Sequence, residues 1–317
     1  MYKRIFPIIE SPLLFEILKF NILKKSIFYE SLPAHGEGEP YYFDDTKPLL
    51  HFTESEEEKG RMLLNKMGID SDSWYICFYC RDSAYLSSER DKRYGWRVNY
   101  NPFDLSYQDH RNNDIKTYLE SAEYITSLGG FAVRMGANVD EKLPDLNNPR
   151  IIDYSWYHRT EFGDIYLPAK CKFFLGGTSG LWAIPAIFDV PIACPNFIRY
   201  NIINFRQGSW FIPKKIWSAG EKRYLTFREI LQSEVADFYR DEHYAKAGLE
   251  VVDNTPEEIL DLAREMNERL DGTFETTEED EELQNRFLSL YPEYLYSYGT
   301  PARIGTVFLR KNEELLE

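Results

Sequence analysis

The stretch CKFFLGGTSGLWAIPAIFDVPIACPNF, residues 171–197, has the pattern of one βαβ unit. Its apolar run Phe173–Leu175 is typical of a strand that is buried on both faces. A turn of small residues, Gly176–Gly180, leads into an apolar segment that we expect to be helical, Leu181–Phe188. A second short strand is expected at Pro191–Cys194.

The glycine-rich turn of this unit is a candidate anion site. A turn of this composition before a helix offers free N–H groups, hydroxyls and the positive end of the helix dipole. We therefore predict that it binds phosphate through Gly177, Thr178, Ser179 and Gly180. An ordinary βα loop with a hydroxyl cap is the alternative. Pro185 lacks an N–H and clashes with the carbonyl of Leu181, so the helix is expected to be kinked or to begin late.

Strands and helices alternate over most of the chain. Capping signals at Thr53, Asp114 and Thr255 predict three helices, and Gly68 and Gly129 end the first two. Strands are expected at Trp74–Cys80, Phe131–Val133, Ile151–Ile152, Cys171–Leu175, Ile192–Cys194 and Leu249–Val252. This alternation predicts an α/β fold with one doubly wound, mainly parallel, Rossmann-like sheet.

Three regions are expected along the chain. Residues 1–70 form a small N-terminal helical and irregular region, residues 71–272 the Rossmann-like domain, and residues 273–317 an acidic connector with a tail that packs back. The connector is expected to be solvated over Phe274–Leu283 because of its run of carboxylates. Pro12–Phe28 reads as an amphipathic helix that docks on a partner or on lipid, or, as we favour, packs on the body of the protein.

Composition limits the class of ligand. The 317 residues carry a formal net charge of −15, which repels nucleic acid and anionic lipid, so we expect no nucleic-acid partner. An anionic ligand then requires a local cluster of arginines or N–H groups. The four cysteines form neither a disulfide framework nor a zinc site, and we predict no metal and no cofactor. No signal peptide is evident, so a cytoplasmic protein, with peripheral contact to the inner face of the membrane, is expected.

Functional groups stand where the predicted strands end. Arg81 and Asp82 follow the first strand, Arg134 the second, and Asp153 and Tyr154 the third. Ligands of doubly wound sheets bind outside the carboxyl ends of the strands. Two arginines near the hydroxyl-rich turn therefore indicate a pyrophosphate site. In the alternative interpretation, Arg81 pairs with Asp82 or Asp153 at the sheet edge.

Three common enzyme motifs are absent from the sequence. The turn at residues 176–180 is not G-x-G-x-x-G and occurs late in the chain, which disfavours a dinucleotide oxidoreductase. No Walker lysine motif and no G-x-S-x-G elbow is present. The anion site therefore belongs to another class.

A series of segments resembles a bacterial family of surface-polysaccharide glycosyltransferases. These are YICFYCRDSAY (75–85), RNND (111–114), GGFAVRMG (129–136), IDY (152–154), residues 173–196 and ARIGTVFL (302–309). The family is similar to the nucleotide-binding half of GT-B enzymes and, distantly, to fucosyltransferases with an H-x-R motif. The resemblance implies a nucleotide-sugar donor bound by residues 71–272 and transfer to a glycan or lipid-linked acceptor without an obligatory metal.

The resemblance also assigns roles by position. Arg81 matches the arginine of H-x-R, which would stabilise the departing nucleotide, and Thr178 and Ser179 match the phosphate turn. Arg134 would be a second cation near the diphosphate, and Asp153 would bind the base or ribose. Two features depart from the family: Tyr79 replaces the motif's histidine, and residues 1–70 are short for an acceptor domain.

The general base is not determined by the sequence. An inverting transferase needs a base for the acceptor hydroxyl, and the candidates are Asp82, Asp109, His110 and His35. A retaining mechanism is equally open. A catalytically silent subunit or glycan-binding module is the alternative function.

The segment Arg199–Arg223 is basic and aromatic. Two interpretations stand side by side: it receives an anionic glycan or a lipid phosphate, or it neutralises the acidic remainder in a contact between subunits of a homo-oligomer.

Overall fold

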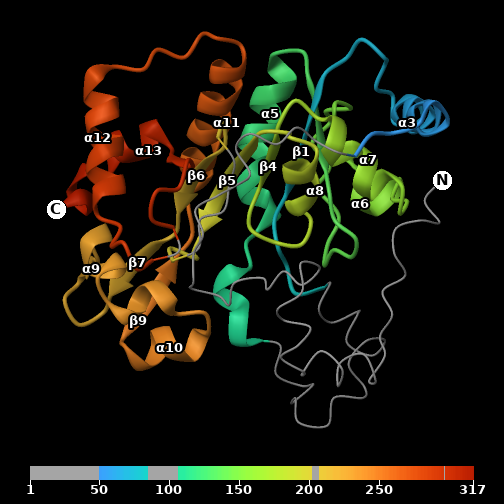
Figure 1. Cartoon of the computed structure of the whole chain (residues 1–317). Helices are drawn as coiled ribbons and strands as arrows, with labels where there is room; N and C mark the ends of the chain where they lie inside the picture. Colours follow the sequence, from blue (N-terminus) through green and yellow to red (C-terminus); the bar gives the residue numbers. More distant parts are fainter. Residues whose placement is uncertain (1–49, 85–105, 202–206, 296) are drawn as a thin grey trace, which may run out of the picture. The chain divides into compact units, whose positions relative to one another are not determined.

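Seven parallel strands form the central sheet of the computed structural model, which describes residues 50–84, 106–201, 207–295 and 297–317. The strand order is β10-β6-β5-β4-β1-β2-β3. Figure 1 labels four neighbouring strands of this sheet, β6, β5, β4 and β1. The strands are β1 (Tyr75–Tyr79), β2 (Phe131–Arg134), β3 (Ile151–Asp153), β4 (Phe174–Gly176), β5 (Ile192–Phe197), β6 (Trp210–Pro213) and β10 (Arg303–Ile304).

The chain reverses its direction of winding between β1 and β4. From β1 it adds β2 and β3 on one side, and then returns to place β4, β5 and β6 on the other. This is the strand order of the dinucleotide-binding α/β fold, in which the ligand crevice lies at the reversal point. In the β1–β4 pair, Tyr79 stands opposite Gly176. The predicted doubly wound, mainly parallel sheet is confirmed.

The predicted strand Leu249–Val252 exists, but it does not belong to the central sheet. As β9 it pairs antiparallel with β7 (Lys215–Ser218), which also pairs antiparallel with β8 (Arg223–Tyr224). The prediction that this strand extends the parallel sheet was therefore wrong. Strands β6, β7, β8 and β10 had not been predicted.

Helix starts follow the capping signals of the sequence. Thr53 and Thr255 form reciprocal capping boxes before α3 (Glu54–Lys66) and α11 (Pro256–Leu270). The Asp114 side chain accepts a hydrogen bond from Lys116 N at the start of a 3₁₀ turn that continues into α5. The remaining helices include α5 (Leu119–Ser127), α6 (Tyr154–Tyr157), α7 (Gly163–Lys170), α8 (Ala183–Ile187), α9 (Phe227–Leu231), α10 (Asp241–Lys246), α12 (Glu278–Ser289) and α13 (Thr306–Lys311), with 3₁₀ helices η2 (Ser106–Arg111), η3 (Ile115–Tyr118), η4 (Glu234–Asp237) and η5 (Glu313–Leu316).

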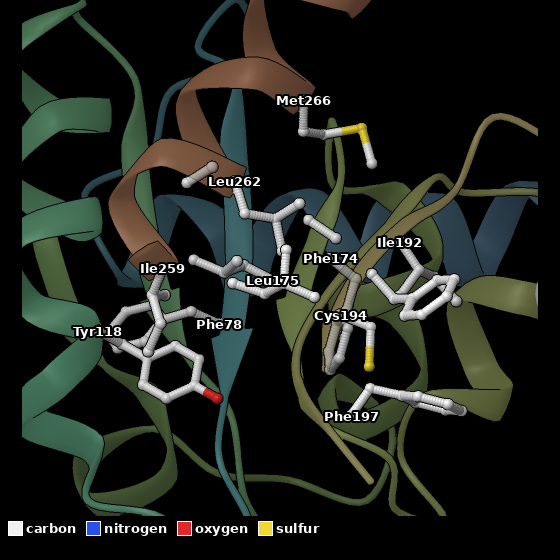
Figure 2. Packing of buried hydrophobic residues seen from close by; sticks show 14 of the residues in the cluster. Phe78, Tyr118, Phe174, Leu175, Ile192, Cys194, Phe197, Ile259, Leu262 and Met266 are labelled. Carbon is white, nitrogen blue, oxygen red and sulfur yellow. The ribbon is translucent and has the colours of Figure 1, made fainter. Parts of the chain in front are cut away.

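Two residues of β1, Tyr75 and Phe78, show that different helices cover the two faces of the sheet. Tyr75 donates a hydrogen bond from its hydroxyl to Leu167 O of α7, at 3.1 Å. Phe78, an odd number of residues away and therefore on the other face, lies with Ile259 and Leu262 of α11 (Figure 2). Phe78 is fully buried, and burial of such a side chain contributes about 1.5–3 kcal/mol.

The acidic connector is helical in its second half. Thr277 caps α12, which begins inside the segment expected to be a solvated linker. Asp280 of α12 is 1% exposed and accepts two hydrogen bonds from Arg310 of α13, both at 2.6 Å. The expectation of a wholly solvated connector was wrong because one of its carboxylates, that of Asp280, is buried and pairs with the guanidinium of Arg310.

None of the helices in the described ranges is long and apolar enough to cross a membrane. The expected amphipathic helix Pro12–Phe28 lies outside the described residues.

Candidate ligand-binding cleft

A cleft of about 560 Å³ opens at the carboxyl ends of β1 and β4. It therefore lies at the reversal point of the sheet, where ligands of this fold class bind. Its polar lining comes from six places in the chain: the end of β1, helix η2, the segment after β2, helix α7, the turn after β4 and the segment after β5. The side chains that matter here are Arg81, Asp82, Arg111, Thr178, Ser179 and Arg199.

Arg81 leaves the end of β1 and enters the cleft as predicted. Its Nη1 donates a hydrogen bond to the carbonyl oxygen of Gln108 in η2, at 2.7 Å. Partial burial is the main cause that lowers the pKa of Arg81. The alternative interpretation, in which Arg81 pairs with Asp82 or Asp153, does not hold, since Asp153 pairs with Arg134 and Asp82 accepts backbone N–H groups.

Arg111 contributes a second guanidinium from η2. Its Nη1 donates to Gln108 Oε1 at 2.9 Å, and its Nη2 donates to the carbonyl oxygen of Thr178 at 3.0 Å. Its Nε is buried and has no hydrogen-bond partner among the residues that the structure describes. Burial, followed by repulsion from Arg81 and Arg199, lowers the pKa of Arg111 to about 10.

Arg199 adds the third positive charge to the same cleft. Within the described ranges, no carboxylate forms an ion pair with Arg81, Arg111 or Arg199. Three guanidinium groups that repel one another are costly to hold together, and a bound anion would relieve that cost. The donors match carboxylate and phosphate geometry better than ammonium groups would. This arrangement of charges can accommodate an anion of more than one charge.

The turn after β4 forms one wall of the cleft. Thr178, Ser179 and Gly180 line it, whereas the buried Gly177 does not. Helix α8 begins at Ala183 and is five residues long. It does begin late, as Pro185 indicated, and it is too short for its dipole to dominate anion binding. The electrostatic contribution expected from a helix N-terminus comes instead mainly from the three arginines.

Tyr79 stands in the cleft where the resemblance would place a histidine. Burial raises the pKa of Tyr79 to about 12, although a hydrogen bond with Ser179 acts in the opposite direction. Tyr79 is therefore a neutral hydroxyl at pH 7. It can donate a hydrogen bond to a ligand, but it cannot exchange a proton as a histidine would.

Asp82 is one of two carboxylates in the cleft lining, the other being Asp164, which pairs with Arg159. Its two oxygens accept hydrogen bonds from Ala84 N at 3.1 Å and Asp140 N at 3.2 Å. Burial is the main cause that raises the pKa of Asp82. Asp82 also borders a second hollow of about 600 Å³ that contains Arg134. A fixed carboxylate with a raised pKa suits a general base.

Arg134 and Asp153 lie close together but not in the cleft. They are register partners on β2 and β3, and Arg134 Nη1 lies 3.2 Å from Asp153 Oδ2. Both side chains are at most 5% exposed. Asp153 also accepts hydrogen bonds from Leu143 N and the Ser155 hydroxyl. The structure gives this pair a role in joining two strand ends, and neither side chain reaches the three-arginine cluster.

The side chains of Tyr154 and His110 also form hydrogen bonds with other residues, and neither residue lines the cleft. The hydroxyl of the buried Tyr154 donates to Thr160 O at 2.7 Å. The His110 ring is bonded to Asp241 and its side chain is 6% exposed. Burial lowers the pKa of His110. His35 lies outside the described residues.

The basic segment Arg199–Arg223 does not form one surface patch in the part of the chain that the structure describes. Lys214 pairs with Asp253, Lys215 with Glu258, and Arg223 with Glu229. Arg199 turns into the cleft. Three of the six basic side chains of the segment thus form ion pairs with carboxylates of the same chain.

The sequence prediction did not place Arg111 and Arg199 in the cleft. Arg199 stands two residues after Phe197, the true end of β5, but the strand had been predicted to end at Cys194. A strand drawn through Pro195 would have put Arg199 at a strand end. Arg111 had no such signal, because it lies on a 3₁₀ helix in a long excursion between β1 and β2.

Comparisons with protein-family models, with curated proteins and with solved structures gave no match for this chain.

Proposed function

We propose that the cleft binds the diphosphate of a nucleotide-sugar donor, and that the protein is a glycosyltransferase of GT-B type. The acceptor would be a glycan or a lipid-linked glycan of surface polysaccharide biosynthesis. One observation carries the proposal: Arg81, Arg111 and Arg199 line one cleft at the reversal point of the sheet without carboxylate partners in the described residues. A cytoplasmic location at the inner face of the membrane belongs to the same proposal.

The chemistry required of such a site fits these groups. A departing nucleoside diphosphate develops negative charge, and preorganised guanidinium groups in a partly dry site stabilise that charge. Tyr79, Thr178 and Ser179 add neutral donors beside them. The volume of about 560 Å³ falls within the range of small-ligand pockets.

Asp82 is the base that this geometry favours among the three candidates that the structure describes, Asp82, Asp109 and His110. It borders the cleft next to Arg81, whereas the His110 ring is bonded to Asp241. Asp109 accepts a hydrogen bond from Asn112 Nδ2 and does not line the cleft. In an inverting reaction Asp82 would take the proton of the acceptor hydroxyl as that oxygen attacks the sugar's anomeric carbon.

A thermal-shift panel of GDP-, UDP-, dTDP- and CMP-sugars tests the proposal. A ligand at about 100 times its Kd stabilises the folded state by about 2.7 kcal/mol, which raises Tm by about 4 °C for a chain of this size. Arg81→Ala should remove most of that rise. Arg228→Ala, which deletes an exposed arginine of α9, should keep it.

Two results would count against the proposal. If no nucleotide or nucleotide sugar stabilises the wild-type protein, the donor site is absent. If a nucleotide binds but the pure protein neither transfers nor hydrolyses any donor, the alternative of a silent glycosyltransferase-like subunit or glycan-binding module replaces the enzyme.

A further inference from the structure

Lys214 is a fully buried lysine at the carboxyl end of β6. Its Nζ donates hydrogen bonds to His110 O at 2.6 Å and Asn112 O at 3.3 Å, and pairs with Asp253 Oδ1 at 2.6 Å. An ammonium group is rarely buried without such compensation. The two carbonyl groups belong to the residues on either side of Arg111.

Residues 109–113, the segment around Arg111, have further hydrogen bonds to other parts of the chain. Asp241, the first residue of α10, accepts hydrogen bonds from Asp109 N at 2.9 Å and His110 N at 3.0 Å. Asn113 N donates to Arg81 O at 2.9 Å. Residues 109–113 are thus held from the C-terminal half of the chain, and they in turn contact the end of β1.

We infer that Lys214 is a positioning residue for Arg111. The ammonium group donates hydrogen bonds to the backbone carbonyls on both sides of Arg111. These bonds fix the direction in which the Arg111 guanidinium enters the cleft. Lys214 does not line the cleft and would touch no ligand. The inference rests on the proposed function, because it assigns Arg111 to binding of the diphosphate.

The backbone part of the inference can be measured without any ligand. Lys214→Met keeps the bulk of the side chain and removes the ammonium group. Amide hydrogen exchange at residues 109–113 should then become about tenfold faster, because the segment opens locally. Exchange in β1, β2 and β4 should not change. Lys215→Met removes the neighbouring lysine, which pairs with Glu258, and should leave exchange at residues 109–113 at the wild-type rate.

A second variant covers the case in which Lys214→Met fails to fold. Asp253→Asn weakens the ion pair at a carboxylate whose side chain is 46% exposed, so the fold should tolerate it. A smaller acceleration at the same amides is expected. Unchanged exchange at residues 109–113 in the folded variants would overturn the inference.

Inorganic pyrophosphate serves as the probe for the link to Arg111. Lys214→Met and Arg111→Ala should each weaken its binding about tenfold, and the double variant should bind like Arg111→Ala alone. A purely structural lysine would instead weaken binding again in the Arg111→Ala background, which would contradict a role through Arg111.

The two proposals fail in different ways. If exchange accelerates as expected but the wild-type protein binds neither pyrophosphate nor any nucleoside diphosphate, the proposed function falls while the hold of Lys214 on residues 109–113 stands. If the wild-type protein binds pyrophosphate and Lys214→Met binds it equally well, the positioning role falls while the proposed function stands.

Discussion

Arg111 Nη2 donates a hydrogen bond to the backbone carbonyl of Thr178, at 3.0 Å. This contact joins helix η2 to the turn after β4 across the reversal point of the sheet. Two segments that are far apart in sequence thereby form one wall of the cleft. Within the described part of the chain, the buried Nε of Arg111 has no hydrogen-bond partner, which is a costly arrangement unless a ligand uses the charge.

The repulsion among Arg81, Arg111 and Arg199 should lower the free energy of unfolding of the protein without ligand. Arg111→Met removes a partly buried charge that Arg81 and Arg199 repel, and relief of this repulsion should outweigh the lost hydrogen bonds to Gln108 and Thr178. The free energy of unfolding without ligand should therefore rise, by at most about 1 kcal/mol. The same variant should lose stabilisation by pyrophosphate. Denaturant unfolding with and without pyrophosphate checks both effects. A variant that is destabilised without ligand would show that Arg111 is mainly a structural residue.

Asp82→Asn should separate binding from transfer. The amide keeps the size of the side chain and cannot accept a proton, so transfer should fall by about 10²–10⁴-fold while donor affinity stays near that of the wild type. Asp109→Asn is the matched comparison, because Asp109 is an exposed carboxylate that does not line the cleft. Loss of transfer in Asp109→Asn but not in Asp82→Asn would assign the base to Asp109.

Gly176 sets the spacing of β1 and β4 beneath the cleft. A Cβ there would lie 2.7 Å from the carbonyl oxygen of Tyr79 and 2.8 Å from Phe174 Cε1. Gly176→Ala should therefore destabilise the protein by about 1–3 kcal/mol and weaken nucleotide binding. Gly220→Ala, where a Cβ meets nothing within 4 Å, should change neither. Equal effects of the two substitutions would contradict this account of the strand pair.

Most of the central sheet could be predicted, because buried strands read as apolar runs between turn signals. Strands β7 and β8 were missed for a physical reason: they lie in a sequence of mixed basic and aromatic residues whose charges pair internally. Strand β10 has two residues and leaves no pattern of its own. The antiparallel place of β9 depends on β7, so it could not be predicted either.

The candidate site was predicted in part. Placing Arg81 and the turn after β4 at one sheet edge was right, because both follow strands that are adjacent in the fold. Arg134 and Asp153 also follow adjacent strands, but as register partners of opposite charge they bind one another. Sequence alone does not reveal the register, and therefore it cannot tell a ligand-binding arginine from one that a neighbouring strand neutralises.

The Asp280–Arg310 pair should make stability depend on pH in the acid range. Its hydrogen bonds with Arg310 are the main cause that lowers the pKa of Asp280 from 3.8 to about 2. The folded state binds fewer protons than the unfolded state in this range, so the contribution is present above about pH 4 and is lost as the pH falls towards 2.

Asp280→Asn should remove this contribution. At pH 7 the variant should be about 2 kcal/mol less stable than the wild type, because it loses hydrogen bonds between charged groups. The difference should shrink as the pH falls from about 4 to about 2. Glu279→Gln, at an exposed position of the same helix, is the control. A difference between wild type and Asp280→Asn that does not change with pH would contradict the assignment.

A crystal structure with a bound nucleoside diphosphate tests the central claim most directly. The account predicts that the diphosphate lies between the carboxyl ends of β1 and β4, within hydrogen-bond distance of Arg81, Arg111 and Arg199. A diphosphate bound at another place, such as the hollow that contains Arg134, would contradict it, as would an empty cleft at saturating nucleotide.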